Sequence, residues 1–292
     1  MVICHILGGI GNQMFQYAAG RALSLSTNQV HWLDLNDFFD YKLHNGFELD
    51  RVFNINEIKS STDTTDNLLG WRANPLAKKI LLRSQFARLR GQSFIVEPHF
   101  NYWPEFFELK RDCYLYGYWQ SERYFKNIET IIRQDFSFKQ PLNEFNQQIA
   151  TDIAKMESVS LHVRRGDYVN DPKTTATHGI CSISYYVNAI NYIANQINNP
   201  VFYIFSDDID WVKKNLQINF PHTYIAHNRG VESYNDMHLM SLCKHHIIAN
   251  SSFSWWGAWL NPSPNKLVIA PKNWFATETN TADLLPRNWI KL

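Results

Sequence analysis

The chain has 292 residues, 45% of them hydrophobic, so it can bury a large core and is predicted to form two domains. Its 28 basic residues nearly balance 27 acidic ones, which argues against the broad cationic surface of a nucleic-acid-binding protein. The four cysteines show neither Cys-x-x-Cys spacing nor the density of a disulfide framework. This excludes a cysteine-based metal site and favours a reducing compartment.

The N-terminal segment combines a strand, a glycine-rich loop and a helix. Val2–Leu7 has no charged leader and only a short apolar run, so we expect a strand rather than a signal peptide. The loop lacks a phosphate loop's lysine, and Met14 stands where a dinucleotide-binding loop needs its third glycine. Gly11, Asn12 and Gln13 are therefore expected to face a ligand at a helix N-terminus, with a simple tight turn as the alternative.

The N-terminal half continues with a strand expected at Val30–Asp34 and two further stretches of interest. Tyr41–Ile55 keeps neither helical nor strand periodicity and mixes polar with aromatic residues, as a binding loop does. Leu76–Arg90 has apolar and basic residues at helical spacing, which predicts one basic amphipathic helix. Such a helix can rest on an anionic membrane surface, although an ordinary solvated face is the alternative. No window reaches the ~18 apolar residues of a membrane span.

The junction between the two domains is expected near residue 155. Strands are predicted at Phe94–Val96 and Tyr114–Tyr118, and Pro141–Lys155 is polar and helical. From Val159 onward strands and helices alternate, the pattern of a parallel sheet wrapped by helices. We therefore expect an N-terminal domain over residues 1–155 and a C-terminal domain over residues 156–292.

Two adjacent arginines stand at the end of the first strand of the C-terminal half. The alternating segment Val159–Val163 runs into Arg164 and Arg165, followed by a turn-forming glycine and Asp167. Side chains at this end of a strand point into the crevice where open α/β sheets bind ligands. Guanidinium pairs bidentately with phosphate, each charge-assisted bond contributing roughly 1.5–3 kcal/mol. The pattern predicts a phosphate clamp, with a surface Arg-Asp turn as the alternative.

Acidic residues follow the next predicted strand. Val201–Phe205 leads to Asp207 and Asp208, where a carboxylate can accept hydrogen bonds from a ribose hydroxyl or a base edge. Asp208 and Asp210 also form a literal Asp-x-Asp, which holds a divalent cation in metal-dependent sugar transferases. Because the segment from Asp210 has a helical pattern, we expect Asp210 to cap or decorate a helix and predict no metal ligand.

A serine-rich helix start follows a later strand. The strand Ile247–Ala249 leads to Ser251, Ser252 and Ser254, ahead of a helix rich in tryptophan. Serine hydroxyls and backbone N–H groups at a helix N-terminus attract anions, helped by the helix dipole. This start is a second candidate part of an anion site, and helix capping alone is the alternative.

Several spaced motifs together resemble one known family. They are GGIGNQMFQYAA at Gly8–Ala19, HVRRGDY at His162–Tyr168 and SSFSWWGAWL at Ser251–Leu260, joined by FSDD at Phe205–Asp208 and HGIC at His178–Cys181. In this order and spacing they resemble glycosyltransferase family 11, the α-1,2-fucosyltransferases, and specifically its soluble bacterial members. The least typical part, residues 60–90, lies where acceptor choice is expected to be set.

The resemblance implies a GT-B-like α/β fold in which two Rossmann-like domains face a cleft. It implies inverting, metal-independent transfer of L-fucose from GDP-β-L-fucose to the 2-hydroxyl of a terminal galactose, with no further cofactor. The C-terminal domain would bind GDP-fucose, and the N-terminal domain would take a galactose-terminated glycan or lipid-linked oligosaccharide. Bacterial members act at the cytoplasmic face of the membrane, so we expect a cytoplasmic protein that does not bind nucleic acid.

The matched motifs carry the family's site residues over to this chain. Arg164 corresponds to the arginine that grips the β-phosphate, Arg165 lies beside it, and Asp208 corresponds to an acid that reads the nucleoside. The groups that line the diphosphate or face the donor are Ser251, Ser252, Ser254, Gly11, Asn12 and Gln13. A proton acceptor for the galactose hydroxyl is expected at Asp167 or His162, and Asp167 could instead orient the arginines.

Two other functions fit the same sequence. A different nucleotide-sugar transferase would hold a metal ion through Asp208 and Asp210. A carbohydrate-binding protein would use the aromatic residues, 15% of the chain, without catalysis. Turnover of a UDP-sugar in place of GDP-fucose would favour the first, and glycan binding without stabilisation by GDP would favour the second.

Overall fold

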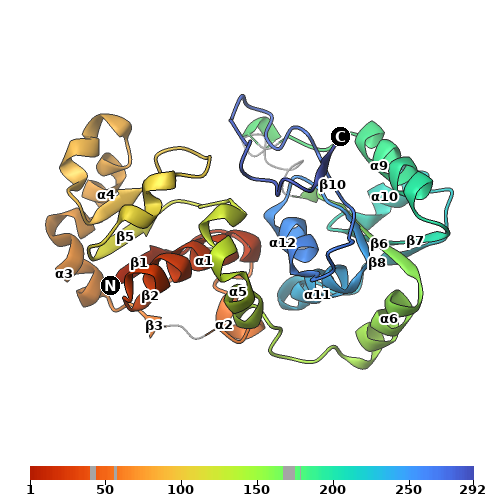
Figure 1. Ribbon diagram of the computed structural model, residues 1–292, viewed down its shortest axis with the longest axis horizontal. Helices are drawn as coiled ribbons and strands as arrows, with labels where there is room; N and C mark the ends of the chain where they lie inside the picture. Colours follow the sequence, from red (N-terminus) through yellow and green to blue (C-terminus); the bar gives the residue numbers. More distant parts are fainter. Residues whose placement is uncertain (40–43, 56–57, 167–174, 178) are drawn as a thin grey trace. The chain divides into compact units, whose positions relative to one another are not determined.

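The chain folds into two compact units, seen in a computed structural model that describes residues 1–39, 44–55, 58–166, 175–177 and 179–292 (Figure 1). The first unit comprises Met1–Lys139 and Asn280–Leu284, and the second Gln140–Thr279 and Leu285–Leu292. The polypeptide therefore passes from the first unit to the second before helix α6 (Glu144–Lys155), and the boundary predicted at residue 155 is wrong.

Helix α6 belongs to the second unit because of its packing. It lies against strand β6 (Glu157–Val163) and helix α11 (Tyr234–Leu242). Its buried Asn146 side chain donates to Asn228 Oδ1 over 2.9 Å. The polar helix predicted at the junction thus covers one flank of the C-terminal sheet.

The first unit is built on a parallel sheet in the order β3-β2-β1-β5-β4. Its strands are β1 (Val2–His5), β2 (His31–Asp34), β3 (Ile58–Lys59), β4 (Phe94–Val96) and β5 (Cys113–Tyr116). Its helices are α1 (Ile10–Thr27), α2 (Leu49–Val52), α3 (Thr62–Leu69), α4 (Pro75–Leu81) and α5 (Glu129–Asp135), with 3-10 turns η1 (Asn36–Phe39), η2 (Gly70–Ala73), η3 (Ser84–Arg90), η4 (Pro104–Glu108), η5 (Glu122–Tyr124) and η6 (Lys126–Ile128). The strands predicted in this half are confirmed.

Helices cover both faces of this sheet. Helix α1 packs on β1 and β2 so closely that a Cβ at Gly20 would lie 1.9 Å from Cys4 Sγ. On the opposite face Ile3 and Tyr114 pack with Leu69 and Leu81. The strands are parallel, so the loops that follow their carboxyl ends lie along one edge of the unit.

The helix predicted over residues 76–90 is interrupted, which corrects that prediction. Helix α4 ends at Leu81, and the chain continues as the 3-10 segment η3. Arg90 folds back, and its Nε donates to the Leu81 carbonyl over 2.7 Å. A carbonyl in the last turn of the helix thereby gains a side-chain hydrogen-bond donor. Leu76 and Ile80 are exposed, at 73% and 47%, so the apolar stripe does not form one core-facing band.

The second unit is built on a six-stranded parallel sheet in the order β11-β10-β9-β6-β7-β8. Its strands besides β6 are β7 (Pro200–Ser206), β8 (His222–Ile225), β9 (His245–Ile247), β10 (Val268–Ala270) and β11 (Ile290–Lys291). Its helices include, besides α6 and α11, α9 (Ile183–Gln196), α10 (Ile209–Asn215) and α12 (Ser252–Leu260), with the 3-10 turn η7 (Gly230–Glu232). The predicted alternation is confirmed, and β11 adds an edge strand that the sequence did not reveal.

Strand β6 lies at the centre of this sheet, between β9 and β7. Val159, Leu161 and Val163 pack with the apolar stripe of α9 on one face, whereas Tyr203 and Phe205 pack toward α6 and α11 on the other. Parallel strands end at the same edge of a sheet, so the segments after β9, β6 and β7 are neighbours. Among the described residues no helix is long and apolar enough to cross a membrane.

Candidate functional site

The strongest candidate site lies where β6 and β7 end side by side. Arg164 Nη1 lies 3.1 Å from Asp207 Oδ2, and the Arg165 backbone N–H donates to Asp207 Oδ1 over 2.9 Å. The Asp207 carboxylate therefore holds both arginines: it contacts the side chain of Arg164 and the backbone N–H of Arg165. The side chains of Arg164 and Asp207 are about a quarter exposed, at 24% and 25%, so a ligand can reach them.

The second arginine is packed more tightly. The Arg165 guanidinium carbon lies 3.6 Å from the centroid of the Trp211 ring, and Nε lies 3.6 Å from Asp208 Oδ2. The distance from Nε to Asp208 is longer than a hydrogen bond. The buried Nε has no hydrogen-bond acceptor in the part of the chain that the structure describes. A buried donor without a partner is costly, so this atom is a candidate ligand contact.

Glycine 166 permits the close approach of the two strand ends. A Cβ at this position would lie 2.8 Å from Asp207 Oδ2 and would push the carboxylate away from Arg164. Asp208 begins helix α10 and accepts from the Trp211 backbone N–H over 3.2 Å. Asp210 lies in the first turn of that helix, as predicted. One oxygen of Asp208 is thus occupied by capping, and the predicted nucleoside contact would use the other.

The serine-rich segment follows β9, the other neighbour of β6. Ser251 is the N-cap of α12, but its hydroxyl caps no backbone N–H of the helix. Ser252 is half-buried, whereas Ser254 is buried and donates to the Ser251 carbonyl over 3.3 Å. We therefore assign Ser254 a positioning role, which corrects its prediction as a ligand contact. The first turn of α12, with Ser251 and Ser252, keeps its predicted role as an anion-binding element.

His162 is a poor proton acceptor, contrary to its predicted role. Its ring is buried, and burial together with the nearby Arg164 charge lowers the pKa of His162 to about 3. A general base works best with a pKa near the working pH, and a group with so low a pKa does not hold the transferred proton. The ring centroid lies 5.8 Å from that of Phe253, so His162 packs the end of β6 against α12. Asp167, the other predicted acceptor, lies outside the described residues.

In the first unit, helix α1 begins at Ile10, so the Gly-Asn-Gln motif lies in its first turn. Gln13 is fully buried; its amide donates to the Gly8 and Gly46 carbonyls, each over 2.8 Å, and accepts from the Glu48 N–H over 3.0 Å. Both donors are used, so the prediction that Gln13 donates to a ligand is wrong and its role is to join two loops. Gly11 is buried in the same turn.

Asn12, the neighbour of Gln13, differs from it in burial and in the use of its donor group. It is half-buried, and its Oδ1 accepts from Gln120 Nε2 over 2.8 Å. This bond fixes the orientation of the amide, and no described residue accepts from Asn12 Nδ2. Asn12 therefore remains the predicted ligand donor of the motif.

Sequence reasoning missed a buried carboxylate in the first unit. Glu97, directly after β4, accepts from the backbone N–H groups of Tyr118 and Trp119 over 2.7 and 3.0 Å. Burial raises the pKa of Glu97 to about 7. Trp119 has a φ of 55°, rare for a bulky residue, and a Cβ at Gly117 would collide with Glu97. The available signal was a lone acid immediately after a predicted strand.

No group of three or more metal-ligating side chains occurs within the described ranges of the chain. What the site of the second unit offers is a pair of fixed guanidinium groups next to a helix N-terminus. Such an arrangement can bind a phosphate-containing ligand and stabilise negative charge that develops on it.

Known proteins resemble this chain over its whole length. The sequence model described as Glycosyl transferase family 11 matches residues 93–292. An Alpha-1,2-colitosyltransferase from Escherichia coli is 37% identical over 300 residues, which cover 100% of this chain and 99% of that protein. The O-antigen biosynthesis glycosyltransferase WbnK, also from Escherichia coli, is 33% identical over 306 residues, with 98% of each chain covered.

The fold is similar to that of the NodZ α-1,6-fucosyltransferase, crystallised with GDP. The TM-score is 0.54 at 13% identity, over 89% of this chain and 92% of NodZ. The fold class is therefore GT-B with two Rossmann-like α/β units, as predicted. The family model covers more than half of the chain, and both relatives match it almost from end to end. The chain is a glycosyltransferase and belongs to glycosyltransferase family 11.

Proposed function

We propose that this enzyme transfers L-fucose from GDP-β-L-fucose to the 2-hydroxyl of a terminal galactose, forming an α-1,2 linkage with inversion. The observation that carries the proposal is the pair Arg164 and Arg165, held by Asp207 at a sheet edge beside the start of α12. Two fixed cations match the charge of a diphosphate. The α-1,2 linkage in the name of one relative and the soaking of NodZ crystals with GDP-fucose support the same choice.

The proposed mechanism follows from where charge develops. As the bond between the fucosyl C1 and the β-phosphate oxygen breaks, its electron pair stays on the phosphate, and the guanidinium donors stabilise that charge. The sugar becomes oxocarbenium-like, and the galactose oxygen attacks C1 from the opposite face, which inverts the configuration. The hydroxyl proton passes to a base, for which Asp167 is the predicted residue. Ser251 and Ser252 are proposed to line the diphosphate, Asp208 to accept from the nucleoside, and Asn12 to donate to the donor.

We propose that the arginines replace a metal ion in this reaction. Purified enzyme given GDP-fucose and lactose should release GDP and form an α-1,2-fucosylated product at the same rate with and without excess EDTA. NMR of the product gives the linkage. Loss of activity on chelation that Mg²⁺ or Mn²⁺ restores would contradict this part of the proposal, and turnover of a UDP-sugar without turnover of GDP-fucose would contradict the donor.

A second candidate donor is GDP-colitose, because the relative with 37% identity is named a colitosyltransferase. Colitose lacks the 3-hydroxyl of fucose, and the two donors share the GDP group that the arginine pair would hold. Comparing kcat/KM for the two donors with one acceptor separates these candidates. A preference for GDP-colitose of a hundredfold or more would replace fucose in the proposal and leave the linkage and the arginine roles unchanged.

Replacement of Asp207 tests whether it positions the arginines. Asp207→Ala removes the partner of Arg164 and of the Arg165 backbone N–H, so the Kd for GDP should rise about tenfold or more. Asp207→Asn keeps an oxygen that accepts from the backbone and should restore part of the affinity. Calorimetric titration with GDP measures both variants. Equal GDP affinity in Asp207→Ala and the parent enzyme would contradict the positioning role.

A further inference from the structure

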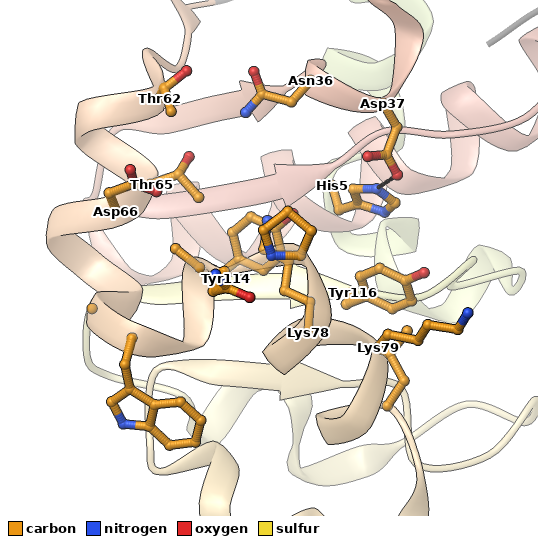
Figure 2. A pocket seen from close by; sticks show the side chains of 16 residues that line it. His5, Asn36, Asp37, Thr62, Thr65, Asp66, Lys78, Lys79, Tyr114 and Tyr116 are labelled. Atoms are coloured by element: carbon orange, nitrogen blue, oxygen red, sulfur yellow. Dashed lines mark hydrogen bonds and ion pairs between the residues drawn. The ribbon is translucent and has the colours of Figure 1, made fainter. Parts of the chain in front are cut away.

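The first unit contains a cavity of about 850 Å³ that the proposed donor site does not use (Figure 2). It lies over the strands β1 and β5 and is closed on the other side by α3, η2 and α4. Its volume falls within the range of about 300–1,000 Å³ that is typical of small-molecule sites. The segment that closes it, residues 62–82, lies within residues 60–90, the part of the chain least typical of the family's motifs.

The floor of this cavity is a buried and electrically compensated network. Tyr114 donates to the buried carboxylate of Asp34 over 2.6 Å. Lys78 Nζ lies 3.8 Å from the same carboxylate and 4.9 Å from the centroid of the Tyr114 ring. The charge of Lys78 is thus offset from below by Asp34, so the floor is polar without being strongly cationic.

One wall of the cavity is flat and rigid. The rings of His5 and Tyr116 stack with centroids 4.5 Å apart and planes 12° apart. A ring nitrogen of His5 lies 2.8 Å from Asp37 Oδ2, the contact drawn as a dashed line in Figure 2. This bond holds the stacked pair in place and leaves the second oxygen of Asp37 to accept from a ligand hydroxyl.

The opposite wall adds hydroxyl, carboxylate and indole groups. Thr62, Thr65 and Asp66 of α3 line the cavity, as Figure 2 shows, and Trp71 lines it from η2 with 57% of its surface exposed. The C–H face of a pyranose ring packs well on an accessible aromatic face such as this indole. Hydroxyl groups of the same ring can bond to the neighbouring carboxylate and threonines.

The charges of the lining select among ligands. Three carboxylates, those of Asp37 and Asp66 in the lining and of Asp34 beneath Lys78, stand against the two amines of Lys78 and Lys79, so the side-chain charges come close to cancelling and leave no excess of positive charge. A nucleoside diphosphate would find little electrostatic attraction in this cavity, whereas the arginine pair of the second unit attracts its negative charge. The combination of aromatic faces, balanced charge and many hydrogen-bonding groups suits a neutral polyhydroxylated ligand.

We propose that this cavity binds neutral sugar residues of the acceptor glycan beyond the galactose that receives the fucosyl group. The assignment of the ligand as acceptor rests on the proposed function, whereas its carbohydrate nature rests on the cavity. An extended acceptor would then react more efficiently than a simple galactoside, and residues of α3 and η2 would set acceptor preference.

The test compares lacto-N-neotetraose with methyl β-galactoside as acceptors for the whole enzyme. Trp71→Ala and Asp66→Asn should each lower kcat/KM for the tetrasaccharide about tenfold. The kcat/KM for methyl β-galactoside and the KM for GDP-fucose should stay unchanged. The matched controls are Asp63→Asn, an exposed acid on α3 outside the cavity lining, and Phe39→Ala, which removes an 87% exposed ring. Phe39 ends the same 3-10 turn as Asp37 but is not among the residues that line the cavity. Both controls should match the parent enzyme.

A binding experiment separates failure of this inference from failure of the proposed function. Saturation-transfer NMR with lacto-N-neotetraose needs no donor, and its signals should weaken in Trp71→Ala but not in Phe39→Ala. Binding of this kind without turnover of GDP-fucose would support the cavity and contradict the proposed function. A parent enzyme that turns over GDP-fucose but shows no preference for the tetrasaccharide, or variants that keep the preference, would overturn the cavity assignment.

Discussion

Replacement of Arg164 by alanine should lower turnover about 10²–10³-fold, the usual cost of removing one fixed donor to developing negative charge. The guanidinium, 24% exposed and held 3.1 Å from Asp207, is fixed before the ligand arrives and loses little freedom on binding. The same change should abolish most of the rise in melting temperature that GDP produces, because binding to the folded state is what stabilises it. Arg164→Lys should restore little, since an ammonium cannot make the bidentate contact.

Arg133 provides a matched control for this prediction. Its side chain is 25% exposed, and its Nη2 lies 2.8 Å from Glu129, so its burial and pairing resemble those of Arg164. Arg133→Ala removes a comparable ion pair from helix α5 and should leave both the GDP-induced shift and turnover unchanged. Substantial activity in Arg164→Ala, or equal effects of Arg164→Ala and Arg133→Ala, would contradict the role proposed for Arg164.

Replacing the two adjacent amide residues of the Gly-Asn-Gln motif should have different effects: Gln13→Ala should mainly lower stability, and Asn12→Ala should mainly lower activity. Gln13→Ala removes the side-chain partner of the buried Gly8 carbonyl and Glu48 N–H and of the partly buried Gly46 carbonyl. At about 1 kcal/mol for each bond, the free energy of unfolding should fall by about 3 kcal/mol. For a unit of this size we expect a melting temperature lower by several degrees, with turnover reduced because the loop before α1 is released.

Asn12→Ala should leave stability almost unchanged and reduce activity. The Asn12 side chain makes one hydrogen bond within the described residues, to Gln120, and is half-buried, so the melting temperature should stay within about 2 °C. Loss of its Nδ2 donor should lower kcat/KM about tenfold to a hundredfold. Thermal unfolding and steady-state kinetics on both variants check the pair. Stability loss in Asn12→Ala, or a stable Gln13→Ala whose only defect is kinetic, would reverse the two assignments.

The sequence by itself determined the fold class, most strands and the position of the arginine pair. These features are local, because alternation of buried positions marks each strand and the residues after a strand necessarily lie at the sheet edge. The order of the motifs, from the glycine-rich start to the serine-rich helix, identified the family. Arg164, Arg165 and Asp208 each stand within two residues of a strand end, and the resemblance to the family assigned them to the donor site.

Tertiary structure alone decided which side chains are free to act, because hydrogen-bond partners far apart in sequence leave no local signal. Gln13 meets carbonyls and amides up to 35 residues away and is thereby removed from ligand binding. Ser121 and Arg123 bond to Asp283 near the other end of the chain. The low pKa of His162 and the raised pKa of Glu97 both come from burial, which depends on packing rather than on neighbouring residues. The sequence motifs thus located the site, and packing decided which of its residues can bind a ligand and which only hold the others in position.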